Sequence, residues 1–209
     1  MSNRQLCIHY LRLHGPIVVA IVLMLFISRV YADYEEGVEA AFSGDFDTAF
    51  REFSTAAAAG LDLAQYNLAI LYFTGQGTTQ DFEQAFKWTQ AAALQGHVDA
   101  QFNLGSLYLD GSGITKSTVR GIDWLASAAR AGHANAAFAL AMMYLEGDPI
   151  PQDEVLAHAW AAKAANNDHA QGLDLKKEIE AGLSQADLST ARRTFARWQI
   201  EAVPALPAQ

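Results

Sequence analysis

Apolar residues recur at helical spacing along most of the chain. Ala64, Leu68 and Tyr72 occupy positions i, i+4 and i+8, which places them on one face of a helix. Gly75 follows this stripe, and a glycine at that point can end a helix by adopting a left-handed backbone conformation. No strand-like alternation of any length appears after residue 32. The pattern therefore predicts an all-α protein.

A second helix is predicted to begin near Asp81, whose carboxylate suits a helix N-terminus. Ala85, Trp88 and Ala92 form its apolar stripe at i, i+3 and i+7. The small residues let a neighbouring backbone approach, while the tryptophan fills the space between helices. Gly96 then ends the helix, so this part of the chain describes a pair of packed helices.

This pair of helices repeats with a period of 36 residues. Shifting the sequence against itself aligns residues 64–99, 100–135 and 136–171. A fixed period of this size indicates an array of helical repeats in which each unit packs on its neighbours. The positions that are identical in all three copies are Ala64/Ala100/Ala136, Leu68/Leu104/Leu140, Tyr72/Tyr108/Tyr144, Gly75/Gly111/Gly147, Trp88/Trp124/Trp160, Ala92/Ala128/Ala164, Ala93/Ala129/Ala165 and His97/His133/His169.

Both ends of the array depart from the pattern. Residues 33–63 are interpreted as a degenerate N-terminal repeat, which is expected of an end unit. Residues 172–200 are predicted to form C-terminal capping helices, the last over roughly Gln185–Ile200, and residues 201–209 a disordered tail. The residues that relate the N-terminal unit to the next one are Asp45, Phe46, Ala49, Phe50 and Gly60, each 36 positions before its counterpart.

Residues 1–32 have the composition of a secretory signal peptide. They hold three arginines, no acid and an apolar run over 16–27. Val30 and Ala32 fit the −3 and −1 positions of a cleavage site, so cleavage is predicted after Ala32, with export to the periplasm or the medium. The run is shorter than the roughly 20 apolar residues of a membrane-spanning helix. An uncleaved inner-membrane anchor is the alternative.

The net charge limits the classes of partner that the chain can bind, and the cysteine content limits the chemistry it can perform. The chain carries a net charge of −9, which argues against nucleic acid and anionic lipid as partners. Residues 33–63 hold eight acids against Arg51 alone. This acidity would orient a basic partner, or it only keeps the end repeat soluble. The one cysteine, Cys7, lies in the predicted signal, so the mature chain would have no thiolate and no disulfide.

Three histidines, one in each repeat, raise the question of a metal site. A three-histidine zinc site needs its nitrogens about 2.0–2.1 Å from one ion. Equivalent positions in stacked repeats are separated by about the 8–10 Å helix-packing distance or more. We therefore expect His97, His133 and His169 to serve the turns between repeats and to bind no metal.

Other candidate sites have structural explanations. The pair Asp153-Glu154 lies at a predicted helix start, where the helix dipole favours acids. The sequence contains no Gly-x-Ser-x-Gly, Ser-x-x-Lys, His-Glu-x-x-His or Walker motif. We expect no catalytic residue and no cofactor, and the recurrent aromatic residues are expected in the core rather than in a ligand cage. The residues to which the pattern assigns a structural signature are Tyr72, Gly75, Trp88, Tyr108, Gly111, Trp124, Tyr144, Gly147 and Trp160.

The repeat pattern resembles that of the Sel-1-like repeat family. The clearest copy is residues 100–135, with Leu104, Gly105 and Tyr108 followed by Gly111 and the later signature positions. The resemblance implies a right-handed superhelix of tetratricopeptide-like helix pairs and a role as an adaptor in protein assemblies. The resulting hypothesis is a non-catalytic periplasmic scaffold that binds a protein or peptide in envelope assembly, polysaccharide export, motility or signalling. The alternative is an envelope hydrolase acting on β-lactams or peptidoglycan.

Overall fold

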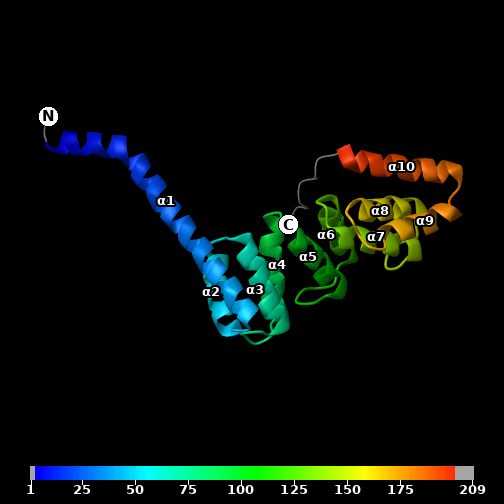
Figure 1. Cartoon of the computed structure of the whole chain (residues 1–209), viewed down its shortest axis with the longest axis horizontal. Helices are drawn as coiled ribbons and strands as arrows, with labels where there is room; N and C mark the ends of the chain where they lie inside the picture. The colour runs from blue at the N-terminus through cyan, green and yellow to red at the C-terminus, as the bar shows by residue number, and fades with distance from the viewer. Residues whose placement is uncertain (1–2, 201–209) are drawn as a thin grey trace.

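The computed structural model describes residues 3–200, and in this range the chain is built from helices without strands. The predicted all-α solenoid of helix pairs is confirmed, and each helix packs mainly on its neighbours along the chain (Figure 1). The predicted tail, residues 201–209, lies outside the described residues. The helices are α1 (Asn3–Ser43), α2 (Phe46–Ala58), α3 (Asp62–Thr74), α4 (Phe82–Leu94), α5 (Val98–Asp110), α6 (Thr118–Arg130), α7 (Ala134–Glu146), α8 (Glu154–Asn166), α9 (Gly172–Gly182) and α10 (Gln185–Ile200).

The first helix of each repeat ends at a glycine in the left-handed conformation, as predicted. Gly75, Gly111 and Gly147 have φ angles of 73°, 79° and 75°. The amide of Gly75 donates to the carbonyl of Leu71 at 2.8 Å, which satisfies one of the last free carbonyls of α3. The same bond recurs at the two equivalent glycines, so one local device sets the length of α3, α5 and α7.

The second helix of each repeat begins at a polar cap. The carboxylate of Asp81 accepts from the amides of Glu83 and Gln84, which confirms the predicted start of α4. Ser117 and Asp153 cap α6 and α8 in the same way. These side chains satisfy amides that have no partner inside the helix.

Two of the loops within repeats pack tightly on the preceding repeat. A Cβ added to Gly77 would lie 2.0 Å from the carbonyl oxygen of Phe46, and one added to Gly113 would lie 1.9 Å from that of Phe82. Only glycine allows this approach together with the positive φ of both positions. The third loop has Pro149 at the corresponding position and therefore follows another path.

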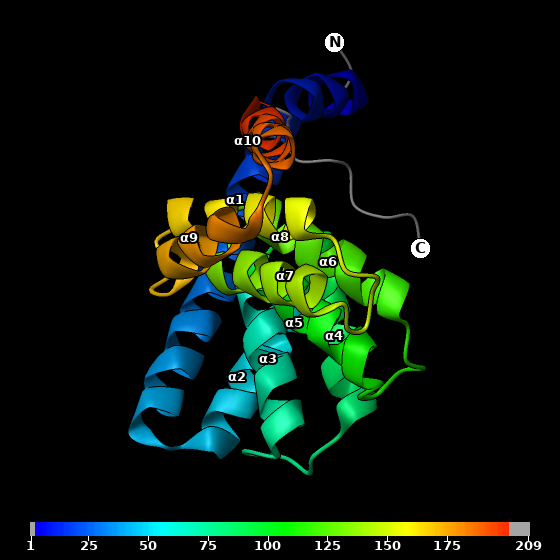
Figure 2. The ribbon, with the colours of Figure 1, turned by 90° about the vertical axis from the view of Figure 1, so that its right-hand side faces the viewer.

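The period-fixed apolar residues form the interior of the array. The alanines and leucines of the first-helix stripes, from Ala64 and Leu68 to their counterparts in α7, are at most 1% exposed. Trp124 and Trp160 are buried as well, whereas Trp88 is half-buried, with the Lys87 ammonium 5.5 Å from its ring centroid. Figure 2 shows how the helix direction changes along the array, with α2 and α3 upright and α7 and α8 nearly horizontal.

The C-terminal helices close the last repeat. α10 packs on α8, where the rings of Trp198 and Trp160 lie 4.0 Å apart between centroids. Below them, the buried ring of His158 places Nε2 3.4 Å from Oε2 of Glu180 on α9, and Oε1 of Glu180 accepts from Arg192 of α10 at 2.6 Å. These contacts join α8, α9 and α10 into one cap.

At the other end, α1 is continuous across the predicted cleavage point after Ala32. The Arg29 guanidinium donates to the carboxylate of Asp33 at 2.8 Å along this helix. Among the described residues, none of the helices combines the length and apolar character needed to cross a membrane. α1 turns into α2 at Gly44, whose φ is +82°, and the connection between the two helices is short.

Candidate functional site

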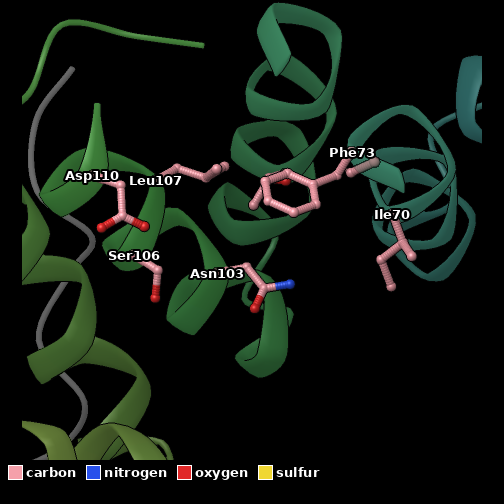
Figure 3. Close-up of a pocket in the computed structure, with 8 residues that line it drawn as sticks. Ile70, Phe73, Asn103, Ser106, Leu107 and Asp110 are labelled. Atoms are coloured by element: carbon pink, nitrogen blue, oxygen red, sulfur yellow. The ribbon is translucent and has the colours of Figure 1, made fainter. Parts of the chain in front are cut away.

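A mainly apolar hollow lies between the first helices of two successive repeats. Residues of α3 and α5 form its walls (Figure 3), and Thr89 of α4 also lines it. The cavity measures about 160 Å³. Its lining consists of Ala69, Ile70, Phe73, Thr89, Asn103, Ser106, Leu107 and Asp110.

The two walls of this cavity differ in chemistry. On α3, the aliphatic Ile70 and the half-exposed ring of Phe73 form an apolar wall, and Phe73 meets Phe82 edge-on with centroids 5.2 Å apart. On α5, Asn103 and Asp110 bring an amide and an exposed carboxylate to the opposite wall. An apolar ligand group could therefore be buried on one side while polar groups orient it from the other.

A second hollow adjoins the first across Ile70. It measures about 410 Å³ and is lined by α1 residues, including Tyr34, Val38 and Phe42. Phe42 is 89% exposed. The Asn67 amide donates to the Tyr34 hydroxyl at 3.4 Å and ties α3 to α1. We call these two adjoining hollows, lined mainly by α1, α3 and α5, the first-helix groove.

The residues of the first-helix groove are not those that the repeat fixes. Ile70 corresponds to Ser106 and Met142 in the next repeats, and Asp110 corresponds to Thr74 and Glu146. The period-fixed residues beside them on the same helices point into the core. Packing selects the fixed positions and leaves the groove positions free to differ.

The nine signature residues are all described by the structure, and none of them lines the first-helix groove. The three glycines end helices, and the aromatic residues belong to or pack against the buried apolar clusters. Tyr108 is buried, and its hydroxyl accepts from the Arg120 guanidinium at 3.4 Å. Desolvation raises the pKa of Tyr144. These residues hold the repeats together, and the first-helix groove is lined by other positions.

The three recurrent histidines lie at the junctions between repeats. Nδ1 of His97 and of His133 accepts from the amide three residues on, so each ring caps the next helix, and His169 accepts from the amide of Gln171. The repeat pattern predicted these residues in turns, but it did not reveal the capping bond. The available signal was a histidine three residues before the stripe alanines Ala100 and Ala136, whereas Leu61 occupies this position before Ala64. The partners on which the three rings stack, at 4.5, 4.4 and 4.1 Å, are Tyr66, Phe102 and Phe138.

His133 is a histidine of this set with a shifted pKa. Burial lowers the pKa of His133, and the carboxylate of Asp99, 3.5 Å from Nε2, partly opposes this shift. Across the part of the chain that the structure describes, no cluster of three His, Cys, Asp or Glu side chains could hold a metal ion. Asp153, the other carboxylate singled out from the sequence, accepts from the amide of Leu156 at the start of α8.

Comparisons with known proteins agree with this architecture. The crystal structure of a Sel1 repeat protein from Oxalobacter formigenes is 27% identical, with a TM-score of 0.62, and the match covers 79% of this chain and 55% of that one. A protective antigen with an SLR fold, from uropathogenic Escherichia coli, is 25% identical with a TM-score of 0.47, over 86% of this chain and 49% of that one. The chain thus spans about half the length of these two proteins. No curated protein matches the sequence.

The family comparison gives the repeat boundaries directly. The model of the Sel1 repeat matches residues 62–97, 98–133 and 134–169. Each matched unit begins at the first residue of α3, α5 or α7. The three units together cover a little over half of the chain. The chain therefore belongs to the Sel1 repeat family.

Proposed function

We propose that this protein is an exported adaptor that holds a segment of a partner protein in the first-helix groove. Sel1 repeats typically mediate protein–protein interactions, and their fold is typically a non-catalytic scaffold. Stacked repeats of this kind present long continuous surfaces to a partner. The observation that carries the proposal is the first-helix groove itself, whose lining varies from repeat to repeat while the stripe alanines and leucines of the first helices stay the same.

Exposed apolar side chains in the groove support this proposal. Phe42 and Phe73 present aromatic rings to solvent on successive first helices, and Ile70 lies between them at the junction of the two hollows. Grouped apolar side chains of this kind mark interaction sites more often than isolated ones do. Buried aromatic anchors also supply most of the binding free energy in typical interfaces.

The charge near the groove favours a partner with basic residues. Asp110 lines the groove on α5, and Glu35, Glu36 and Glu39 are exposed on α1 next to its groove-lining residues. Carboxylates at the rim attract a basic segment and repel an acidic one, which affects specificity and association rate more than affinity. The proposed occupant is therefore a segment with apolar anchors flanked by Lys or Arg.

The proposed location is the bacterial cell envelope. Residues 1–32 would direct export, and cleavage after Ala32 would leave Tyr34, Val38 and Phe42 in the mature protein, so the groove would be complete. Mass spectrometry of the protein isolated from a periplasmic fraction should give a chain that begins at Asp33. A chain that still begins at Met1 in the membrane fraction would favour the inner-membrane anchor instead.

A photocrosslinking experiment in intact cells tests the binding proposal. A photoreactive amino acid at position 106, inside the groove, should crosslink one partner reproducibly. The same residue at position 119, which is exposed on α6 away from the groove, serves as the matched control. Substituting Ile70→Asp should abolish the crosslink at 106 while circular dichroism stays unchanged. Crosslinks that are absent at 106, or identical at 106 and 119, would refute the proposal.

A further inference from the structure

A larger cavity of different character lies at the C-terminal end of the array. It measures about 540 Å³ and is enclosed by α6, α7, α8 and α10. Its walls combine the indoles of Trp160 and Trp198 with the side chains of Arg130, Arg197 and Asp123. No residue is shared with the first-helix groove. The volume falls in the range of about 300–1,000 Å³ that is typical of small-ligand pockets.

Arg130 is the unusual residue of this cavity. Its Nε is buried and has no hydrogen-bond partner among the described residues, and the ion pairs found in that part of the chain do not include it. A buried donor without a partner costs free energy, and the cost is greater when the group is charged. Nε of Arg130 is therefore a donor without a partner in the described chain, on a side chain that is itself only partly buried and lines the cavity.

The repeat does not require an arginine at this position. The residue 36 positions earlier is Leu94 and the residue 36 positions later is Asn166, so helix packing at this register accepts an apolar or a small polar side chain. The neighbouring positions 128 and 129 are alanine in all three repeats, in keeping with packing. Arg130 thus departs from the repeat at a place where the repeat offers it no partner.

The balance of charge around the cavity is positive. Arg130 and Arg197 face the single carboxylate of Asp123. Arg197 is engaged in an interaction of its own, so the donor left for a ligand is Arg130. A guanidinium matches a carboxylate with two parallel hydrogen bonds, and the tryptophan pair supplies a flat apolar wall for the body of a ligand.

We propose that this cavity binds a carboxylate attached to an aromatic or aliphatic group. Arg130 receives the carboxylate, and Trp160 and Trp198 contact the apolar body. The carboxylate comes either from a free organic acid or from an acidic group of a peptide, since both present the same chemistry. The site is independent of the first-helix groove, so either proposal can fail while the other holds.

Titration of the whole chain with N-acetylphenylalanine tests this proposal, because the free acid and its amide differ only in charge. We expect the acid to shift the indole N–H resonances of Trp160 and Trp198 with a Kd on the order of 1 mM, and the amide to bind at least about tenfold more weakly. Equal binding of acid and amide, or an absence of shifts at these two indoles, would overturn the proposal. This comparison needs no variant.

Variants then assign the carboxylate to Arg130. Arg130→Gln should weaken binding of the acid about tenfold or more and leave binding of the amide unchanged, and Arg130→Lys should restore part of the difference. Arg51→Gln, an equal loss of charge at an exposed position on α2, should have no effect. Equal effects of the two glutamine variants would contradict the assignment.

A third arm identifies the source of the carboxylate. The tetrapeptide Ala-Ala-Ala-Phe with a free C-terminus is compared with N-acetylphenylalanine. Tighter binding of the tetrapeptide indicates a peptide ligand, and equal or weaker binding indicates a free acid. Either result supports the carboxylate site, provided that Arg130→Gln weakens it.

Discussion

The central repeats and the C-terminal end of this molecule solve the same packing problem with different residues. In the central repeats, the same alanines and leucines recur every 36 residues, and the recurrent histidines stack on an aromatic ring at the equivalent position of the preceding helix pair. At the end, Trp198 covers Trp160, and His158 contacts Glu180, although neither Trp198 nor Glu180 belongs to a repeat. A repeat cannot bury its own last face, so the chain must close it with unique side chains.

This difference shows that the residues of the sequence fall into two groups. Residues that recur with the period serve packing between repeats. Residues that break the period either close an end of the array or lie on a surface available to a ligand. His158 stands where the two earlier repeats have Phe86 and Ile122. Arg130 stands where the preceding repeat has Leu94 and the following repeat has Asn166. The first of these departures is explained by a contact with α9, whereas the second has no partner in the described chain.

Substituting a loop glycine of the central repeats should cause the largest loss of stability. Gly113→Ala forces a Cβ to 1.9 Å from the carbonyl oxygen of Phe82 at a φ of +73°, so we expect a loss of about 3–5 kcal/mol in the free energy of unfolding. Gly132→Ala meets open space at a φ of +108° and should cost only the strain of about 1–2 kcal/mol. Urea denaturation of both variants measures the difference. Similar losses would mean that the close approach does not matter.

Substitutions in the C-terminal cap should cause the second-largest loss of stability. Trp198→Ala removes the ring that covers Trp160, and we expect a loss of about 3 kcal/mol. Amide hydrogen exchange should show the protection of α10 lost while that of α3 and α5 is kept, because contacts in a repeat array are local. Ile200→Ala, at an exposed position of the same helix, is the control. Loss of protection throughout the array would contradict a local cap.

The stability of the C-terminal end should depend on pH through His158. His158 is 1% exposed, and burial lowers its pKa below the ordinary value of 6.5, against the opposing effect of Glu180 and with minor help from Lys176 and Arg192. The folded protein then holds fewer protons than the unfolded chain, so stability is full above pH 6.5 and falls as the pH drops below it. His158→Ile should flatten this dependence between about pH 7.5 and 5.5.

Thermal unfolding at several pH values measures that slope. Isoleucine is the natural choice because Ile122 occupies the same register one repeat earlier. His133→Asn serves as the comparison, since burial also lowers the pKa of His133. An unchanged slope in His158→Ile would show that another group titrates.

Substituting a histidine at a junction between repeats, such as His133, should cause the smallest loss of stability. His133→Ala removes both the cap on α7 and the stack on Phe102, with an expected loss of about 1–2 kcal/mol. Asparagine can still cap the helix, so His133→Asn should lose only the stacking part, about 0.5–1 kcal/mol. Chemical denaturation measures both losses. Equal losses in the two variants would assign the whole effect to stacking.

Much of the fold followed from local residues. The left-handed glycine at Gly75, the cap at Asp81 and the final helix over Gln185–Ile200 were all predicted, because each depends on neighbours in the chain. The tight approach of Gly113 to Phe82 was not, since nothing in the loop shows which backbone passes it. The capping role of His133 was equally hidden, because histidine is an uncommon cap and its stacking partner is 31 residues away.

The sequence by itself determined the repeat, its period and the residues that hold neighbouring helices together, because packing in a linear array depends on positions that recur. Only the tertiary structure decided which non-recurring residues meet. The first-helix groove forms because Phe42, Ile70 and Ser106, far apart in the chain, lie along adjoining hollows. The Arg130 cavity forms because α10 folds back over α6 and α8. Both sites depend on contacts between distant segments, which no local pattern encodes.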